Sequence, residues 1–318
     1  MASNNEIISR RENFSKTHFR PSVDKISEGS GRHWYGIWSF AKTITSRYMN
    51  GNQPTAVLDI DLHDLWYKLI QVAKITPADE ADADRIVAQV IRIRELGDLC
   101  RHAAPQDTNI DSQKDIRKEV AITSSGARMW TDLPFLVQDL RAAWTNSLYT
   151  MTTKECENLS GVTARLSGGN VCGARMTSCA LILFQAALET QRPILQHDKP
   201  ISDGVEEKIA VQDLMPAVFT WLYWGSYKIW QLCAREPFQV DAELDAMDEH
   251  WAEVGELATA RGVMEVGFNR ERMCFWMNRL KEIAEATQGK DDDFAEKCRW
   301  CANLLGQWDC TMGGRTAE

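Results

Sequence analysis

Two cysteines near the end of the chain have the spacing of a metal or redox motif. Cys298 and Cys301 are separated by two residues, with Cys310 nearby, and thiolates at this spacing can bind zinc or exchange a disulfide. However, no second CxxC or HxxxH lies at a supporting distance, and the six histidines show no ligand spacing. Because unpaired cysteine packs as a small hydrophobe, we predict that both lie in the core. The sequence predicts no metal site and no cofactor.

An acidic string precedes the same cysteines. Residues 291–296 read DDDFAE and contain DDxxE, which resembles the magnesium-binding motif of class I terpene synthases. Carboxylates one helical turn apart can share a hard cation with a diphosphate, but acidic residues at a helix start are also explained by the helix dipole. No downstream partner motif follows, so we interpret the string as a solvated helix start. A terpene cyclase ranks third among the three functions that we consider, after the two described below. It requires Asp292, Asp293 and Glu296 to face a cavity.

The segment 221–230 carries an unusual density of aromatic side chains. Tyr223, Tyr227 and Trp230 have the spacing 0, 4, 7 and form one row of a helix. A second face for packing is formed by Trp221, Leu222, Gly225 and Ile229. Large aromatic side chains are most often core, and the alternative is the wall of a pocket for a flat ligand.

These residues must be positioned by helices, because apolar residues recur at helical spacing and alternating β patterns are essentially missing. We predict an all-α fold, a single compact array of about ten to eleven helices without significant sheet. Its domain would cover residues 33–310, between a flexible polar segment at 1–32 and a flexible tail at 311–318. The predicted helices cover residues 62–73, 76–97, 134–150, 153–167, 173–190, 209–235, 240–254, 273–284 and 294–308.

Composition narrows the classes of partner. The 318 residues carry a net charge of −9, which disfavours nucleic acid. No apolar run is long enough for a membrane span or resembles a secretory signal, and the nine cysteines are an odd number at irregular positions. We therefore expect reduced thiols and a cytoplasmic protein.

Several short strings resemble those of a family of fungal proteins of unknown function. The resemblance spans roughly residues 60–285, and none of the strings is a catalytic signature. They are the helical pair from Leu65-Trp66 to Gly97, Trp130 to Pro134, Asn158 to Leu166, Trp221 to Trp230, and Asn269 to Met273 with Phe275-Trp276.

The resemblance implies a role in natural-product biosynthesis. Members of such families are often encoded beside those pathways, and some are similar to cofactor-free hetero Diels–Alder enzymes of tropolonic sesquiterpene biosynthesis. Such an enzyme dehydrates a hydroxymethyl tropolone to a quinone methide and guides its cycloaddition with a terpene. The chemistry needs a general acid and a dry pocket that orients two reactants. The expected ligands are therefore hydrophobic aromatic or terpenoid small molecules, and a homo-oligomer is left open.

This reading assigns roles to particular residues. Asp132, Arg165 and Arg272 are the catalytic candidates, although a helix cap is favoured for Asp132 and buried ion pairs are the commoner role of such arginines. The rival reading is a non-catalytic helical module that binds a partner protein through an exposed groove. The candidate substrate-binding surfaces are Tyr223, Trp224, Tyr227 and Trp276.

Overall fold

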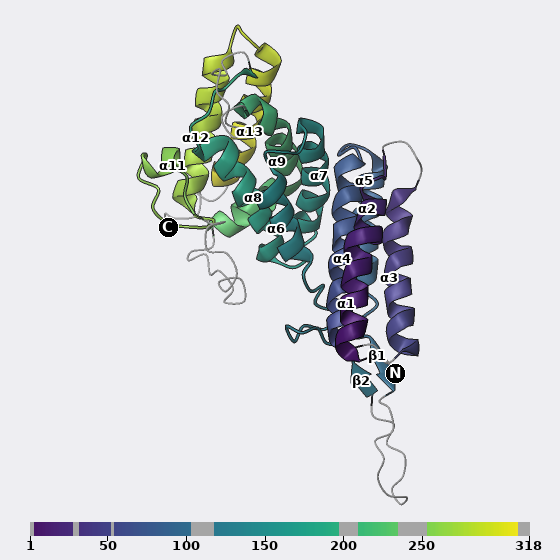
Figure 1. Ribbon diagram of the computed structural model, residues 1–318. Helices are drawn as coiled ribbons and strands as arrows, with labels where there is room; N and C mark the ends of the chain where they lie inside the picture. Colours follow the sequence, from purple (N-terminus) through teal and green to yellow (C-terminus); the bar gives the residue numbers. More distant parts are fainter. Residues whose placement is uncertain are drawn as a thin grey trace, which may run out of the picture. The chain divides into compact units, whose positions relative to one another are not determined.

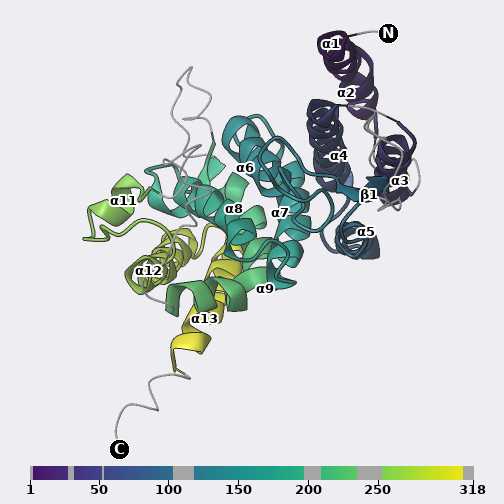
Figure 2. The same cartoon turned by 90° about the horizontal axis from the view of Figure 1, so that it is seen from below.

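The protein is almost entirely helical, which confirms the predicted all-α class. The computed structural model describes residues 3–27, 32–51, 54–102, 118–196, 209–234 and 253–310 (Figures 1 and 2). Within these residues the sheet is limited to β1 (Cys100–His102) paired antiparallel with β2 (Lys118–Val120). None of the helices in these ranges is long and apolar enough to cross a membrane.

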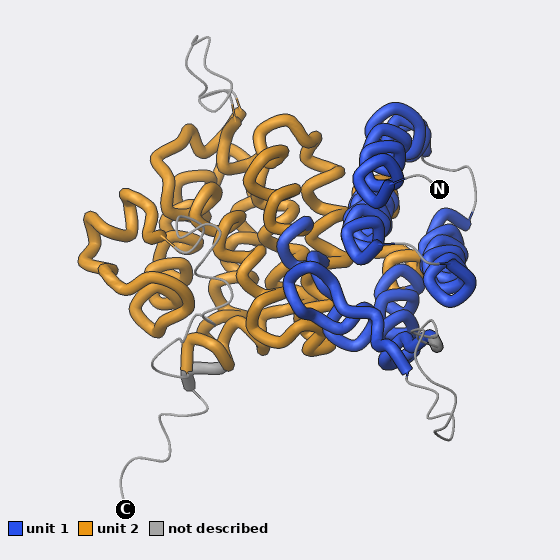
Figure 3. Tube along the Cα trace, turned by 60° about the horizontal axis from the view of Figure 1, so that its bottom comes forward, with its two compact units in different colours: residues 1–72, 85–139 blue, residues 73–84, 140–318 orange. Residues whose placement is uncertain are grey.

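The chain forms two compact units (Figure 3). Unit 1 contains residues 1–72 and 85–139, and unit 2 contains residues 73–84 and 140–318. Three helices, α4 (Thr55–Ile75), α5 (Ala81–Arg94) and α6 (Leu136–Ser147), therefore contribute residues to both units. The single domain expected over residues 33–310 stays a prediction.

Unit 1 begins with three short helices in a segment that we expected to be flexible. They are α1 (Asn4–Phe14), the π-helix η1 (Ser15–Phe19) and α2 (Arg20–Val23). A capping box between Ser3 and Glu6 starts α1. No residue of α1 is buried, so it has no apolar stripe for sequence analysis to detect. It is held to α4 by Arg11 instead, whose guanidinium lies 2.6 Å from Asp61 and 2.7 Å from Asp64.

The rest of unit 1 packs around the apolar stripe of α4. Leu62, Leu65, Trp66 and Leu69 of that helix are fully buried, as their spacing predicts. The neighbouring helices are α3 (His33–Asn50) and α5 (Ala81–Arg94). A helix was predicted over residues 76–97, and α5 lies within this range but begins at Ala81 instead of at Thr76. Helices α3 and α5 meet where the Arg92 guanidinium stacks 3.8 Å from the centre of the Trp38 ring.

Unit 2 is built around α9 (Val211–Ala234), which packs against α7 (Thr153–Gly168), α8 (Ala174–Phe184) and α13 (Asp292–Cys310). The π-helix η2 (Gln185–Glu189) extends α8. The short α11 (Glu256–Thr259) is followed by α12 (Arg270–Thr287), which packs against α13. Helices were predicted at each of these places except α11.

The predicted packing face of α9 is confirmed. Trp221, Leu222, Gly225 and Ile229 are all buried. A Cβ on Gly225 would lie 3.2 Å from the Trp221 ring of the same helix and at an ordinary contact distance, 3.8 Å, from Cβ of Ala164 in α7.

One predicted helix cannot be compared. Its stripe, Val240, Leu244, Met247, Trp251 and Val254, falls up to residue 252 outside the described residues, and so does the tail at 311–318.

Candidate functional site

Large aromatic side chains gather on the outer face of α9. Tyr223, Trp224 and Tyr227 are 61%, 39% and 51% exposed, and Trp300 of α13 is 41% exposed. The rings of Tyr223 and Trp300 stack 6.1 Å apart, and those of Tyr223 and Trp224 meet edge to face at 4.8 Å. We call these four residues the α9 aromatic surface. Contiguous exposed aromatic side chains of this kind often mark a surface that binds a ligand or a partner.

Two hollows flank Trp224. The larger, about 740 Å³, is lined by Phe219, Tyr223, Phe294 and Trp300, together with polar residues such as Asp293. The smaller, about 690 Å³, contains Arg165, Asn170, Tyr227 and Lys228. Both volumes are those of sites for drug-sized ligands, and Trp224 lines both.

Arg165 holds Trp224 in place. Its guanidinium carbon lies 3.7 Å from the centre of the Trp224 ring. Nε pairs with Asp84 at 2.8 Å, Nη1 donates to the Gly161 carbonyl at 2.8 Å, and Nη2 donates to the Ala78 carbonyl at 2.7 Å. Burial lowers the pKa of Arg165, and the charge of Asp84 opposes this shift. The geometry is therefore that of a buried ion-pair partner that positions an aromatic ring, since every guanidinium nitrogen already has a partner.

The smaller hollow has a positive character. Arg165 and Lys228 both line it, and none of its described lining residues carries a carboxylate. Nζ of Lys228 donates to Oδ1 of Asn170 at 2.7 Å. An electron-rich or anionic edge of a ligand would be favoured there.

Arg272 and Trp276 lie together in the core of unit 2. The Arg272 guanidinium pairs with both oxygens of Glu189, at 2.7 and 3.0 Å. The Trp276 indole donates to Glu189 at 2.6 Å, and so does the Gly255 amide at 2.7 Å. Arg272, Trp276 and Glu189 have no solvent exposure, so this cluster ties α12, η2 and residues 253–255 together.

Asp132 belongs to unit 1. Its carboxylate accepts from the Arg128 amide at 2.8 Å and pairs with the Arg128 guanidinium at 3.0 Å. Of the residues proposed from the sequence, the structure thus brings Arg165, Tyr223, Trp224 and Tyr227 together on α9 and its neighbour. Arg272 with Trp276 forms a second group.

Sequence reasoning missed Trp300 and Lys228 as lining residues. Trp300 lies off the apolar stripe of α13, and an exposed tryptophan on the polar face of an amphipathic helix is the signal that identifies it. Lys228 follows Tyr227 directly, and only the turn containing Asn170 shows that its ammonium lines the hollow.

The cysteine and acidic motifs have structural roles. Cys298 and Cys301 are fully buried, which confirms that they belong to the core. The acidic string starts α13, where Asp291 accepts from the Phe294 amide and Asp292 from the Gly289 amide. Across the residues described, no three His, Cys, Asp or Glu side chains are grouped so that they could bind a metal ion.

The buried thiols should be unreactive in the native protein. Burial raises the pKa of Cys156, Cys179 and Cys298 to about 12, so roughly one of these thiols in ten thousand is ionised at pH 8. We expect iodoacetamide at pH 8 to label Cys100 and Cys274, which are partly exposed, before these three. Peptide mapping by mass spectrometry measures the order, and fast labelling of Cys298 in folded protein would contradict it.

Comparison with known proteins gives a family and a fungal relative. The family described as "Protein of unknown function (DUF3632)" matches residues 66–280. The chain is 28% identical over 266 residues to "Oxopyrrolidines biosynthesis cluster protein G" of Penicillium oxalicum (strain 114-2 / CGMCC 5302), covering 80% of this chain and 67% of the relative. No solved structure matches.

Proposed function

The chain belongs to the DUF3632 family of proteins of unknown function, and we propose that it acts in fungal secondary-metabolite biosynthesis. We further propose that it binds a flat aromatic or terpenoid intermediate at the α9 aromatic surface. The name of the Penicillium relative supports the biosynthetic role. The observation that carries the binding site is Trp224, which lines two ligand-sized hollows and is fixed by Arg165. A ring fixed in advance loses little freedom when a ligand stacks on it.

The reaction we propose is the one implied by the sequence resemblance, a cofactor-independent dehydration followed by a hetero Diels–Alder cycloaddition with a terpene. In a hydroxymethyl tropolone-like precursor, the carbon–oxygen bond of the hydroxymethyl group breaks and water leaves. Lys228 is suited to donate a proton to the leaving hydroxide, because its ammonium lines the smaller hollow. The tropolone hydroxyl then returns a proton to Lys228, which leaves a quinone methide. Stacking on Trp224 would hold this planar product beside the terpene.

The test combines native mass spectrometry with a turnover assay free of added metal, using a hydroxymethyl tropolone as the probe. We expect Trp224→Ala to weaken retention of the probe about tenfold, since cation–π and stacking contacts contribute about 1–2 kcal/mol. Tyr35→Ala is the matched control, because Tyr35 is 57% exposed and lies in unit 1. Equal retention by the wild type and Trp224→Ala would contradict the site.

The exposure of the same side chains favours a second candidate. Tyr223 and Tyr227 are more than half exposed, and open aromatic grooves also bind helices of partner proteins. A partner protein released by Trp224→Ala, with no small molecule retained by the wild type, would favour this binding module. The terpene cyclase hypothesis has weaker support. Asp293 lines the larger hollow, but the Asp292 carboxylate accepts a hydrogen bond from the Gly289 amide. Stimulation of turnover by magnesium would favour the terpene cyclase hypothesis.

A further inference from the structure

We propose that His63 and Asp139 form a proton-transfer site in unit 1, with Nε2 of His63 as the base. The substrate class is a planar molecule with a weakly acidic C–H or O–H group and an electron-rich oxygen substituent, such as a carboxylate or a nitro group. The inference uses the contacts of unit 1 alone, so it does not depend on the function proposed for the α9 aromatic surface.

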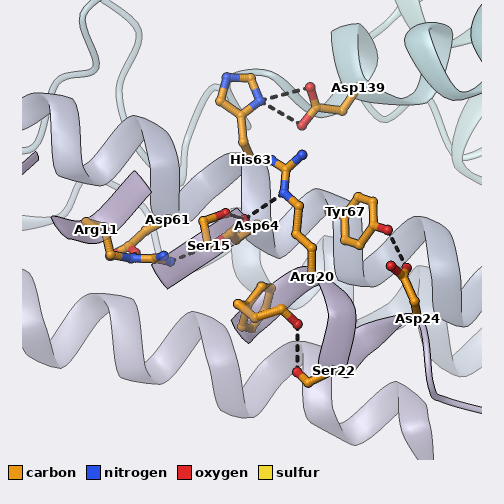
Figure 4. Close-up of polar contacts among 11 residues, drawn as sticks. Arg11, Ser15, Arg20, Ser22, Asp24, Asp61, His63, Asp64, Tyr67 and Asp139 are labelled. Atoms are coloured by element: carbon orange, nitrogen blue, oxygen red, sulfur yellow. Dashed lines mark hydrogen bonds and ion pairs between the residues drawn. The ribbon is translucent and has the colours of Figure 1, made fainter. Parts of the chain in front are cut away.

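The first observation is the pairing of the two side chains (Figure 4). Nδ1 of His63, on α4, lies 2.9 Å from both carboxylate oxygens of Asp139, in the first turn of α6. A carboxylate in this position holds the proton on Nδ1 and leaves the lone pair of Nε2 outward. The histidine side chain is 32% exposed and that of Asp139 is 19% exposed, so the orienting group is more buried than the base. Histidine bases in enzymes are arranged in this way.

The second observation is a strained loop that builds the pair. Leu133 and Phe135, on either side of Pro134, have φ values of +47° and +67°. Such conformations are unfavourable in residues other than glycine, and they persist where surrounding contacts enforce them, often at functional sites. Here the Trp66 indole donates to the Pro134 carbonyl at 2.7 Å.

The same loop also supplies an aromatic ring that packs against His63. The Phe135 ring stacks on the His63 ring with centres 4.3 Å apart and planes 26° from parallel. The amide of Asp139 donates to the Phe135 carbonyl at 2.8 Å, so the same loop starts α6 in the register that brings Asp139 to His63. The loop therefore contacts the His63 ring and also positions Asp139, which accepts from that ring.

The charges around the pair suggest what it binds. Arg20 extends toward His63 (Figure 4), and its Nε donates to Asp64 at 3.1 Å. The Arg20 side chain is 41% exposed, which leaves it accessible to an anionic group of a ligand. Burial raises the pKa of Asp139, while the hydrogen bond from His63 and the charge of Arg20 act against this shift.

A purely structural ion pair between α4 and α6 is the competing explanation. It would fix the helices equally well, but it requires neither a basic Nε2 nor an accessible ring. The two explanations are distinguished by a reaction that measures proton removal directly.

The probe is 5-nitrobenzisoxazole. A base removes its C3 proton, the C–H electron pair forms the nitrile, the N–O bond breaks, and oxygen keeps that bond's electrons as a coloured phenolate. We expect His63→Gln to lower the protein-catalysed rate about 100-fold, as is typical for loss of a general base. Asp139→Asn should lower it about tenfold, because an amide fixes the histidine tautomer less strongly. His18→Gln, which removes an exposed histidine of unit 1, should leave the rate unchanged.

A wild-type rate equal to that of His63→Gln would overturn the proposal. Circular dichroism checks that each variant is folded. If His63→Gln does not fold, diethyl pyrocarbonate provides the same test on the unmodified chain, since it acylates an unprotonated imidazole nitrogen. We then expect the rate to fall in step with acylation of His63, followed by peptide mapping. A rate that survives complete acylation of His63 would also overturn the proposal.

Discussion

Arg272→Met is expected to lower the free energy of unfolding by about 3–5 kcal/mol, the usual cost of removing one partner from a buried ion pair. The substitution leaves the Glu189 carboxylate fully buried, with only the Trp276 indole and the Gly255 amide as partners. Two carbonyls, those of Gly267 and Glu253, also lose the guanidinium that donates to them. Urea unfolding followed by circular dichroism measures the change.

Two further variants test the cause. Arg261→Met removes an arginine that is 63% exposed and pairs with Glu282 on the surface, so it should cost less than about 1 kcal/mol. The double variant Glu189→Gln with Arg272→Met should be more stable than Arg272→Met alone, because it removes the uncompensated charge. A loss below about 1 kcal/mol for Arg272→Met would show that the ion pair does not stabilise the fold.

Arg11→Met is expected to lower the free energy of unfolding by about 2–3 kcal/mol and to release α1 from α4. Arg11 pairs with two carboxylates that have almost no exposure, those of Asp61 and Asp64. Arg47 and Arg20 still compensate part of their charge, so the effect is smaller than at Arg272. The control is Arg10→Met, one residue earlier and exposed, which should change stability little.

The effect of Arg11→Met should depend on pH. Burial raises the pKa of Asp61 in the folded protein, while Arg47 and Arg11 act against this shift. Because the folded pKa is above the unfolded one, protonation favours the folded state, and stability falls as pH rises through the folded pKa. Losing Arg11 should therefore cost most at neutral pH and less as the pH falls toward that pKa. Thermal melts at several pH values measure the difference, and a cost that grows in acid would contradict the assignment.

The sequence predicted what depends on local periodicity. The stripes that contain Leu65, Met273 and Cys298 became α4, α12 and α13, because each buries one helical face. The π-helix η2 was read as ordinary helix, since an extra residue in one turn leaves the apolar pattern almost unchanged. The segment that contains Arg11 was expected to be flexible, because it is polar and lacks apolar periodicity. The structure shows that it contacts α4 through ion pairs, which periodicity does not reveal.

The site depended on contacts that periodicity does not encode. His63 is hydrogen-bonded to Asp139, which lies 76 residues later in the sequence. Arg272 is hydrogen-bonded to Glu189, which lies 83 residues earlier. The row of Tyr223 and Tyr227 was found from its spacing, but only the structure shows that it is exposed and that Arg165 stacks behind it. A charged residue inside an apolar helix is visible in the sequence, whereas its partner is not.

The division into two units has a consequence for synthesis on the ribosome. The chain enters unit 2 at residue 73, returns to unit 1 at residue 85 and leaves it for good at residue 140. Ala78 is therefore translated 87 residues before Arg165, which donates to its carbonyl. At about 5–20 residues per second the early segment waits about 4–17 seconds for this partner. Over that interval residues 73–84 are translated but lack the neighbours that they contact in the folded protein.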